Sequence, residues 1–187
     1  MKINPVILID SREQDPLVFA HLPSERSTLD TGDYSVKGLT HLVACERKSL
    51  DDLLGCVGRE RDRFRRELQR LRAYRFRMLV IEASAADLER GEWRSHLLPA
   101  HVLGSLAAWT AQFALPIWLA GDHQAAGRFT ERWLYQCART VASELESATA
   151  ILAAASASPV DLQRTQAAPV GIGTAPNVLR EIVQNTP

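Results

Sequence analysis

Two carboxylates and a lysine occur at a spacing that suits metal-dependent hydrolysis of a phosphodiester. Glu46 and Lys48 lie two residues apart in a strand-like segment, so their side chains share one face. A hairpin that pairs Lys37 with Leu42 then places Asp33 on the neighbouring strand. In this register Asp33 faces Glu46, with the two Cβ atoms roughly 5 Å apart. A hard cation such as Mg²⁺ offsets the repulsion between such carboxylates and activates water, while a lysine stabilises the charge that develops.

The same two acids also have a purely structural interpretation, in which Asp33 caps a turn and Glu46 pairs with a neighbouring arginine. The predicted secondary structure around the two acids therefore helps to choose between the two interpretations. Apolar and β-branched runs predict strands at 6–9, 33–36, 41–47, 78–81 and 116–119. Helical periodicity predicts helices at 15–22, 49–57, around 64–71, and at 85–89, 99–113 and 125 to about 150. This order predicts an α/β fold, with a mixed sheet covered by helices.

The composition limits the class of protein without selecting one. The 187 residues suit one domain with a tail, and 22 basic side chains balance 22 acidic ones, so net charge favours no partner. Three widely spaced cysteines offer neither a disulfide framework nor a zinc spacing. No apolar run is long enough for a signal peptide or a membrane span. We expect a domain over 1–152, a linker or flexible tail over 153–187, and no membrane association.

The motifs and their order resemble those of XPF-type structure-specific endonucleases. Gly32-Asp33 and, after twelve residues, Glu46-Arg47-Lys48 with Asp52 are similar to the signature of that family. The similarity runs in order over about residues 4–142. Its other segments are Asp10-Ser11-Arg12-Glu13, Gly58-Arg59, Gln69-Arg70-Leu71, Leu79-Val80-Ile81-Glu82, Gly104-Ser105-Leu106 and Leu115-Pro116-Ile117. The family has a restriction-endonuclease-like mixed sheet flanked by helices, which agrees with the α/β prediction.

The resemblance implies a role for each matching residue. Asp33 and Glu46 are implied as ligands of Mg²⁺ or Mn²⁺, with Asp10 near the metal. Lys48 is implied as the catalytic lysine. The remaining implied residues are Glu13, Arg47 and Asp52 in the catalytic site, and Arg12 and Arg59 as contacts to DNA.

Four of these residues have alternative interpretations. Asp10 lies at the end of a predicted strand, which is a common position for a structural acid. Asp52 lies three residues after Ser49, where it can take part in capping a helix. Arg12 can pair with Asp10 or with the acid that follows it. On an ideal strand Arg47 points away from its two neighbours in the motif. A catalytic role for Arg47 then requires a twist of the strand or the use of its backbone carbonyl.

An arginine-rich segment follows the predicted catalytic strand. From Arg59 to Arg77 there are nine arginines and three acids, a local excess of six positive charges. Such a segment can follow a phosphate backbone, and Arg59, Arg63 and Arg66 are the candidates for contact with DNA. Alternatively, these arginines form a solvated helix face with i, i+4 ion pairs.

The last predicted helix carries an apolar stripe in which Phe129, Trp133 and Cys137 recur every four residues. A stripe of this kind usually belongs to the core. Because nuclease domains of the resembled family pair through late helices, we also expect these three residues at a homodimer or heterodimer interface. The tandem helix-hairpin-helix module of many members has no counterpart in 153–187, where residues 170–183 give only a weak signal for one hairpin and helix.

Together these features predict a metal-dependent DNA endonuclease that hydrolyses phosphodiester bonds at branched or flapped DNA, in recombination or repair. We expect it in the cytoplasm, associated with a nucleoid, or in a nucleus, depending on the host. Another nuclease on the same core, restriction-like or specific for Holliday junctions, is disfavoured by the combined motif. A catalytically silent DNA-binding or partner subunit of a nuclease heterodimer is the second alternative, and it is disfavoured because the site acids and Lys48 are all present.

Overall fold

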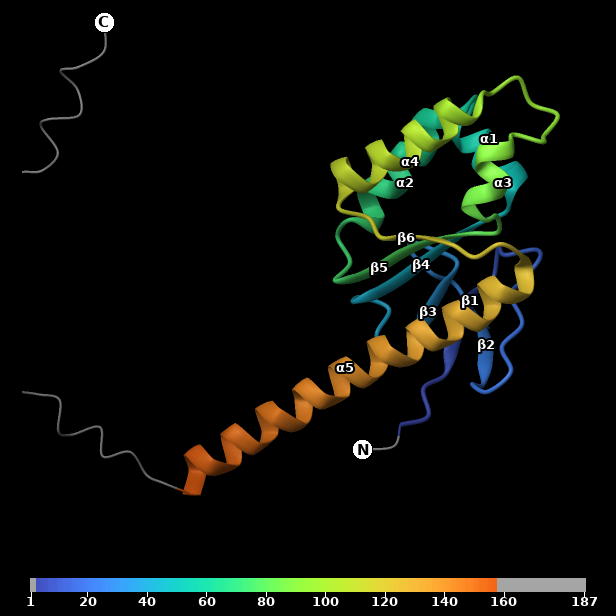
Figure 1. The fold of residues 1–187 in the computed structure, drawn as a ribbon. Helices are drawn as coiled ribbons and strands as arrows, with labels where there is room; N and C mark the ends of the chain where they lie inside the picture. The colour runs from blue at the N-terminus through green and yellow to red at the C-terminus, as the bar shows by residue number, and fades with distance from the viewer. Residues whose placement is uncertain (1–2, 158–187) are drawn as a thin grey trace, which may run out of the picture. The chain divides into compact units, whose positions relative to one another are not determined.

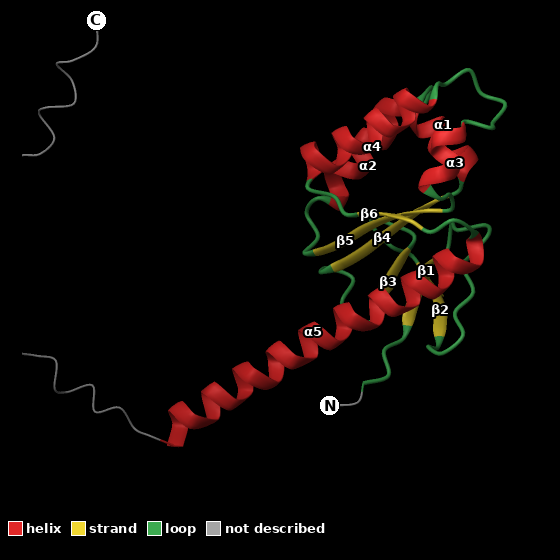
Figure 2. Ribbon diagram, in the orientation of Figure 1, coloured by secondary structure: helices red, strands yellow, loops and turns green. Residues whose placement is uncertain are grey.

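The computed structural model describes residues 3–157, which form a six-stranded sheet with helices on both faces (Figures 1 and 2). β3 is antiparallel to both of its neighbours, whereas the other neighbouring pairs are parallel. The predicted mixed α/β sheet is therefore confirmed. In spatial order the strands are β2 (Ser24–Ser27), β1 (Ile7–Asp10), β3 (Tyr34–Val36), β4 (Val43–Lys48), β5 (Phe76–Ile81) and β6 (Ile117–Leu119).

The helices divide between the two faces of the sheet (Figure 1). One face is covered by α1 (Leu50–Val57), α2 (Arg61–Leu71), α3 (Ala85–Arg90) and α4 (Pro99–Phe113), and the other by the first part of α5 (His123–Ala157). The chain divides after Ser147 into two compact units, so residues 148–157 of α5 belong to the second unit. Within residues 3–157, no helix combines the length and the apolar character that crossing a bilayer requires.

Each face of the sheet carries its own apolar core. On the side of α1 to α4, Leu53 and Phe64 are fully buried, and Phe64 packs edge-on against Trp109 with ring centroids 4.9 Å apart. On the side of α5, Tyr34 and Leu134 are fully buried. The central strands β4 and β5 are therefore nearly continuous runs of buried residues, which is typical of strands covered on both faces.

The segment before β2 differs from its prediction. Residues 15–22 do not form a helix, because their backbone N–H groups bond to other parts of the chain. Leu17 donates to the Tyr34 hydroxyl at 2.9 Å, and His21 donates to Glu131 on α5 at 2.6 Å. β2 lies outside the predicted strands, since it is a polar and largely exposed edge strand without an apolar alternation.

The last helix continues further than predicted. It begins at His123 and extends to Ala157, so residues 153–157 of the predicted linker are helical. The alanine-rich sequence in this part of the chain favours helix. The remainder of the predicted tail, including the hairpin signal at 170–183, lies outside the described residues.

Candidate active site

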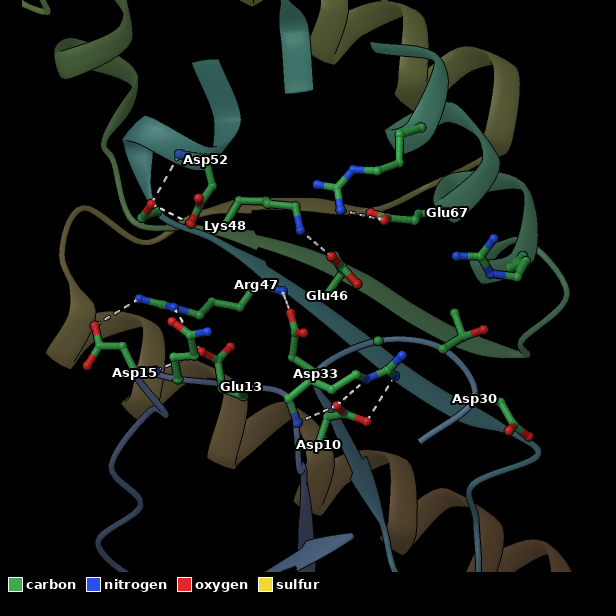
Figure 3. Close-up of a pocket in the computed structure, with 17 residues that line it drawn as sticks. Asp10, Glu13, Asp15, Asp30, Asp33, Glu46, Arg47, Lys48, Asp52 and Glu67 are labelled. Carbon is green, nitrogen blue, oxygen red and sulfur yellow. Dashed lines mark hydrogen bonds and ion pairs between the residues drawn. The ribbon is translucent and has the colours of Figure 1, made fainter. Parts of the chain in front are cut away.

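A hollow of about 600 Å³, which we call the acidic hollow, lies beside the ends of β1 and β4 and is bordered by α1 and α2 (Figure 3). Arg12 and Arg63 line it, as do Glu67 and Arg70, for which the sequence predicts no role. Its lining also includes every residue predicted as catalytic, namely Asp10, Glu13, Asp33, Glu46, Arg47, Lys48 and Asp52.

The loop before β3 places Asp33 against Glu46. Tyr34 lies opposite Cys45 in the antiparallel β3–β4 pair, which is the predicted register and makes Asp33 and Glu46 the next opposed positions. Gly32 permits the close approach, because its φ is 79° and a Cβ would lie 2.9 Å from the Cys45 carbonyl oxygen. The Asp33 N–H donates to that same oxygen at 2.8 Å. The predicted register is therefore confirmed.

Nearby positive charge balances the charges of the two opposed carboxylates only in part. Burial raises the pKa of Asp33, and the charge of Glu46 raises it further, to about 7. Burial likewise raises the pKa of Glu46. Lys48 Nζ contacts Glu46 Oε1 (Figure 3); burial alone would lower the pKa of Lys48, but the charges of Glu46 and Asp33 raise it. One lysine faces one buried and one half-buried carboxylate, and the hollow therefore favours an additional cation.

Mg²⁺ or Mn²⁺ is the kind of ion that fits this donor set. Mg²⁺ commonly uses one or two protein carboxylates and keeps several waters, and Mn²⁺ prefers the same oxygen ligands. Among residues 3–157, no three His, Cys, Asp or Glu side chains converge to surround an ion. The pair of Asp33 and Glu46 therefore fits an ion that takes its other oxygens from water and substrate.

Asp10 does not fit the predicted metal role. Its carboxylate is buried at the end of β1 (Figure 3). Oδ1 accepts hydrogen bonds from the Arg12 N–H and Nε at 2.8 and 2.7 Å, and Oδ2 accepts from Arg12 Nη2 and the Leu29 N–H at 3.1 and 2.8 Å. Burial alone would raise the pKa of Asp10, but these hydrogen bonds lower it. A carboxylate has about four lone-pair sites, and here all four are used by the protein.

Arg47 acts on the acidic hollow through its backbone. Its N–H donates to Asp33 Oδ2 at 2.8 Å, a contact that neither sequence interpretation includes. Its side chain points away from the acid pair, where the guanidinium donates twice to Glu82, at 2.6 and 3.0 Å. The same guanidinium contacts Glu13 at 3.4 Å and the His123 ring at 3.3 Å. Ion pairs and hydrogen bonds thus hold the Arg47 side chain away from the acid pair, while the Arg47 backbone N–H fixes the Asp33 carboxylate.

Two members of this network have no predicted role. Glu82 directly follows β5, and its N–H donates to the Lys48 carbonyl oxygen at 3.0 Å. Its only sequence signal is its place in the motif that ends β5. His123 Nδ1 lies 2.7 Å from Glu82 Oε1, although 41 positions separate the two residues. No spacing along the chain indicates a contact of that range.

Asp52 takes part in the predicted helix cap, and its catalytic role stays a prediction. Its N–H donates to the Ser49 hydroxyl at 3.2 Å, and that hydroxyl donates to Asp52 Oδ2 at 2.7 Å. Ser49 is therefore the N-cap of α1. Because Asp52 also lines the acidic hollow, the cap fixes the position of a site carboxylate.

The predicted DNA-contacting arginines occupy different places. Arg63 lines the acidic hollow, whereas Arg59 lines a separate hollow of about 370 Å³. Arg66 is not part of the lining of the acidic hollow. Arg63 also pairs with Glu60 and Glu67 along α2, so the predicted helix-face ion pairs exist as well. Contact of Arg59 and Arg66 with DNA stays a prediction.

The apolar stripe on α5 belongs mainly to the core. Cys137 is 3% exposed and packs in the core beneath α5, so it is unavailable to a partner and its predicted interface role is wrong. Phe129 and Trp133 are half-buried against the same core. Phe129 also stacks on Trp118 of β6, with ring centroids 4.1 Å apart and planes 4° apart. Part of this aromatic surface remains exposed, because Trp118 is 45% exposed.

Comparison with known proteins agrees with this fold. The family model for the ERCC4 domain matches residues 9–133. XPF from Aeropyrum pernix is similar with a TM-score of 0.59 and 16% identity, over 71% of this chain and 61% of that chain. XPF from Aeropyrum pernix in complex with DNA gives 0.58 and 17%, over 73% and 66%. The chain spans less than two thirds of the length of either structure, and no curated protein matches it. The fold is restriction-endonuclease-like.

Proposed function

This chain belongs to the ERCC4 domain family of nucleases, and we propose that it is a divalent-metal-dependent DNA endonuclease. The observation that carries the proposal is the opposed pair of half-buried Asp33 and buried Glu46, with Lys48 beside it. The proposed substrate is branched or flapped DNA, processed in recombination or repair. This substrate class follows from the family, whose match covers residues 9–133.

Each of these residues of the acidic hollow has a separate proposed role in the reaction. Asp33 and Glu46 would hold Mg²⁺ or Mn²⁺, which when bound lowers the pKa of a water molecule and offsets charge on the phosphate. Lys48 places an ammonium beside Glu46, where it can stabilise charge on the phosphate oxygens. The Arg47 N–H keeps Asp33 oriented towards this position. Glu13 and Asp52 line the same hollow and are proposed to orient bound groups.

DNA and a second subunit are the proposed partners. One similar structure is XPF from Aeropyrum pernix in complex with DNA, and Arg12 and Arg63 border the acidic hollow here. We propose pairing, as a homodimer or heterodimer, through the exposed part of the aromatic surface at Phe129 and Trp133. Sedimentation of the full chain tests homodimer formation, with Trp133→Asp compared against Thr140→Asp on an exposed part of α5. We also keep residues 1–152 as the proposed nuclease domain and 153–187 as its tail.

The proposed activity is tested by mapping cleavage products. The full chain is incubated with end-labelled 3′-flap, fork, four-way junction and plain duplex DNA, in Mg²⁺, Mn²⁺ or EDTA. We expect metal-dependent cutting near the branch, and a rate on the order of 10²-fold lower for Asp33→Asn. Asp51→Asn changes an exposed acid on α1 outside the acidic hollow, and it should cut like the wild type. DNA binding without cutting of any substrate would instead favour the silent subunit.

A further inference from the structure

Asp10 and Arg12 form a unit whose geometry differs from that of an ordinary surface ion pair. Asp10 is 1% exposed, and its four lone-pair sites accept three hydrogen bonds from Arg12 and one from the Leu29 N–H. The Arg12 side chain is 69% exposed. A carboxylate that is filled in this way has no site left for an ion. Its effect on the acidic hollow must therefore pass through the groups that it holds, which are Arg12 and the Leu29 N–H.

The Arg12 guanidinium is fixed on one edge and open on the other. Nε and Nη2 donate to Asp10, and Nη2 also donates to the Leu29 carbonyl oxygen at 2.7 Å. No group in residues 3–157 accepts a hydrogen bond from Nη1. An exposed arginine ordinarily loses rotamer entropy when it binds a ligand. Here the protein has already restricted the side chain before any ligand arrives.

Arg12 is also part of the acidic hollow. Arg12 lines this hollow together with Asp33 and Glu46. The pKa of Arg12 is raised first by the hydrogen bond and charge of Asp10, and further by the charges of Asp33 and Glu46. The guanidinium therefore lies within electrostatic reach of the acid pair. Arg63 also lines the hollow, but its guanidinium pairs with two glutamates on α2.

The resemblance to XPF-type nucleases already implies that Arg12 contacts DNA. Resting on that contact and on the proposed nuclease function, we propose that Asp10 is a positioning residue, which holds the Arg12 guanidinium in place for a phosphate of the DNA strand and does not bind the metal. Guanidinium donors match the oxygens of a phosphate, and a charge-assisted hydrogen bond from a restrained arginine loses little entropy on binding. Leu29 completes the arrangement by bonding to both partners of the pair. Asp10 is then required for the orientation of Arg12 and has no direct contact with a metal.

The test separates metal binding from DNA binding. Asp10→Asn, Arg12→Ala, Arg12→Lys and the double variant of Asp10→Asn with Arg12→Ala are prepared in the full chain. Mn²⁺ affinity is measured without DNA, with Asp33→Asn as the reference for a lost ligand. The affinity for a 3′-flap duplex is measured in EDTA over a range of salt concentrations. Arg90→Ala is the matched control, because Arg90 is an exposed arginine paired with Asp87, away from the acidic hollow and from the arginine-rich segment.

We expect Asp10→Asn and Arg12→Ala to bind Mn²⁺ within about twofold of the wild type, while each weakens DNA binding roughly tenfold. For Arg12→Ala, the slope of log affinity against log salt should fall by about one. The double variant should bind DNA no more weakly than Arg12→Ala alone, because the two residues act as one unit. Arg12→Lys keeps the charge without the planar donors and should fall between wild type and Arg12→Ala.

Two results would overturn the proposal. One is a loss of Mn²⁺ affinity in Asp10→Asn that matches Asp33→Asn, and the other is wild-type DNA affinity and salt slope in Arg12→Ala. If buried Asp10→Asn fails to fold in a thermal melt, the two exposed Arg12 variants still decide the DNA contact. A chain that binds DNA through Arg12 but never cuts it would contradict the proposed function alone.

Discussion

At the scale of single residues, acids of the acidic hollow differ in what already binds them. Asp10 is saturated by hydrogen bonds from the protein, and Asp52 accepts a hydrogen bond from the helix cap. Asp33 accepts one hydrogen bond from the Arg47 N–H, and Glu46 contacts Lys48. Asp33 and Glu46 therefore keep spare acceptor sites, and burial also raises both of their pKa values.

Replacing Lys48 by methionine should separate catalysis from metal binding. The ammonium contacts Glu46 and repels a bound dication, so Lys48→Met is expected to bind Mn²⁺ severalfold more tightly at pH 8. The same change removes charge stabilisation, and the single-turnover cleavage rate should fall on the order of 10²-fold. Lys37→Met is the control, because Lys37 pairs with exposed Glu25 on another part of the sheet. Weaker Mn²⁺ binding by Lys48→Met would contradict this assignment of charges.

The sequence predicted which residues lie in the site better than it predicted what each of them does there. The two-residue alternation of a strand is enough to place Glu46 and Lys48 together, and the hairpin register adds Asp33. The task of Asp10 depends on Leu29, 19 positions later, and that of Arg47 depends on Glu82, 35 positions later. Such contacts arise from the packing of separate strands and loops, which no local spacing describes.

At the scale of elements, the turn into β3 controls the distance between the two carboxylates. Gly32 lies in the left-handed region and directly against the Cys45 carbonyl oxygen, so any side chain there would push the loop away from β4. Gly38 also has a positive φ, of 83°, but a Cβ there would meet nothing within 4 Å. The two glycines therefore share a backbone conformation and differ in their surroundings.

Alanine at Gly32 and at Gly38 should separate the cost of the left-handed backbone conformation from the cost of the close contact with β4. Gly38→Ala is expected to lower the free energy of unfolding by roughly 1 kcal/mol, the cost of a left-handed alanine. Gly32→Ala should lower it by roughly 1–3 kcal/mol more, because its Cβ would overlap the Cys45 carbonyl oxygen. Gly32→Ala should also weaken Mn²⁺ binding, since Asp33 moves with the loop. Urea denaturation and Mn²⁺ titration measure both effects, and equal losses for the two variants would contradict the close approach.

The elements with strong local signals were predicted well. The helix predicted at 99–113 coincides with α4, where Pro99 starts the helix, and Ser49 caps α1. The helix predicted at 15–22 is absent, and β2 is present without a signal. Both differences have the same cause: these segments obtain their backbone hydrogen bonds from distant partners, which outweigh their local preference.

At the scale of the whole molecule, α5 contacts residues 18–22, the segment that leads away from the acidic hollow. Glu131 on α5 is 5% exposed and accepts the N–H groups of His21 and Leu22 at 2.6 and 2.8 Å. Gly127 lies so close to this segment that a Cβ would be 2.7 Å from the Val18 carbonyl oxygen. The helix that covers one face of the sheet therefore also fixes the chain that follows the site residues of β1.

Stability should depend on the charge of Glu131. Burial alone would raise its pKa, but hydrogen bonds from the His21 ring and from backbone N–H groups lower it below 4.5. Because the folded pKa is depressed, the stabilisation is complete above pH 4.5 and is lost as the pH falls through the folded value. Glu131→Gln is expected to lose roughly 1–2 kcal/mol at pH 7 and almost nothing near pH 2. Urea denaturation at both pH values, with exposed Glu146→Gln as the control, checks this. A loss that does not change with pH would contradict it.

The most direct test of the central claim is the single-turnover rate of 3′-flap cleavage across a Mg²⁺ titration. Wild type, Glu46→Gln and Glu25→Gln are compared, because Glu25 is an exposed glutamate outside the acidic hollow. We expect no cleavage by the wild type in EDTA and a saturable rise with Mg²⁺. Glu46→Gln should need more Mg²⁺ and reach a lower plateau, whereas Glu25→Gln should follow the wild-type curve. Cleavage in EDTA, or a Glu46→Gln curve that superposes on the wild type, would contradict the assignment of Asp33 and Glu46 as the metal-binding pair.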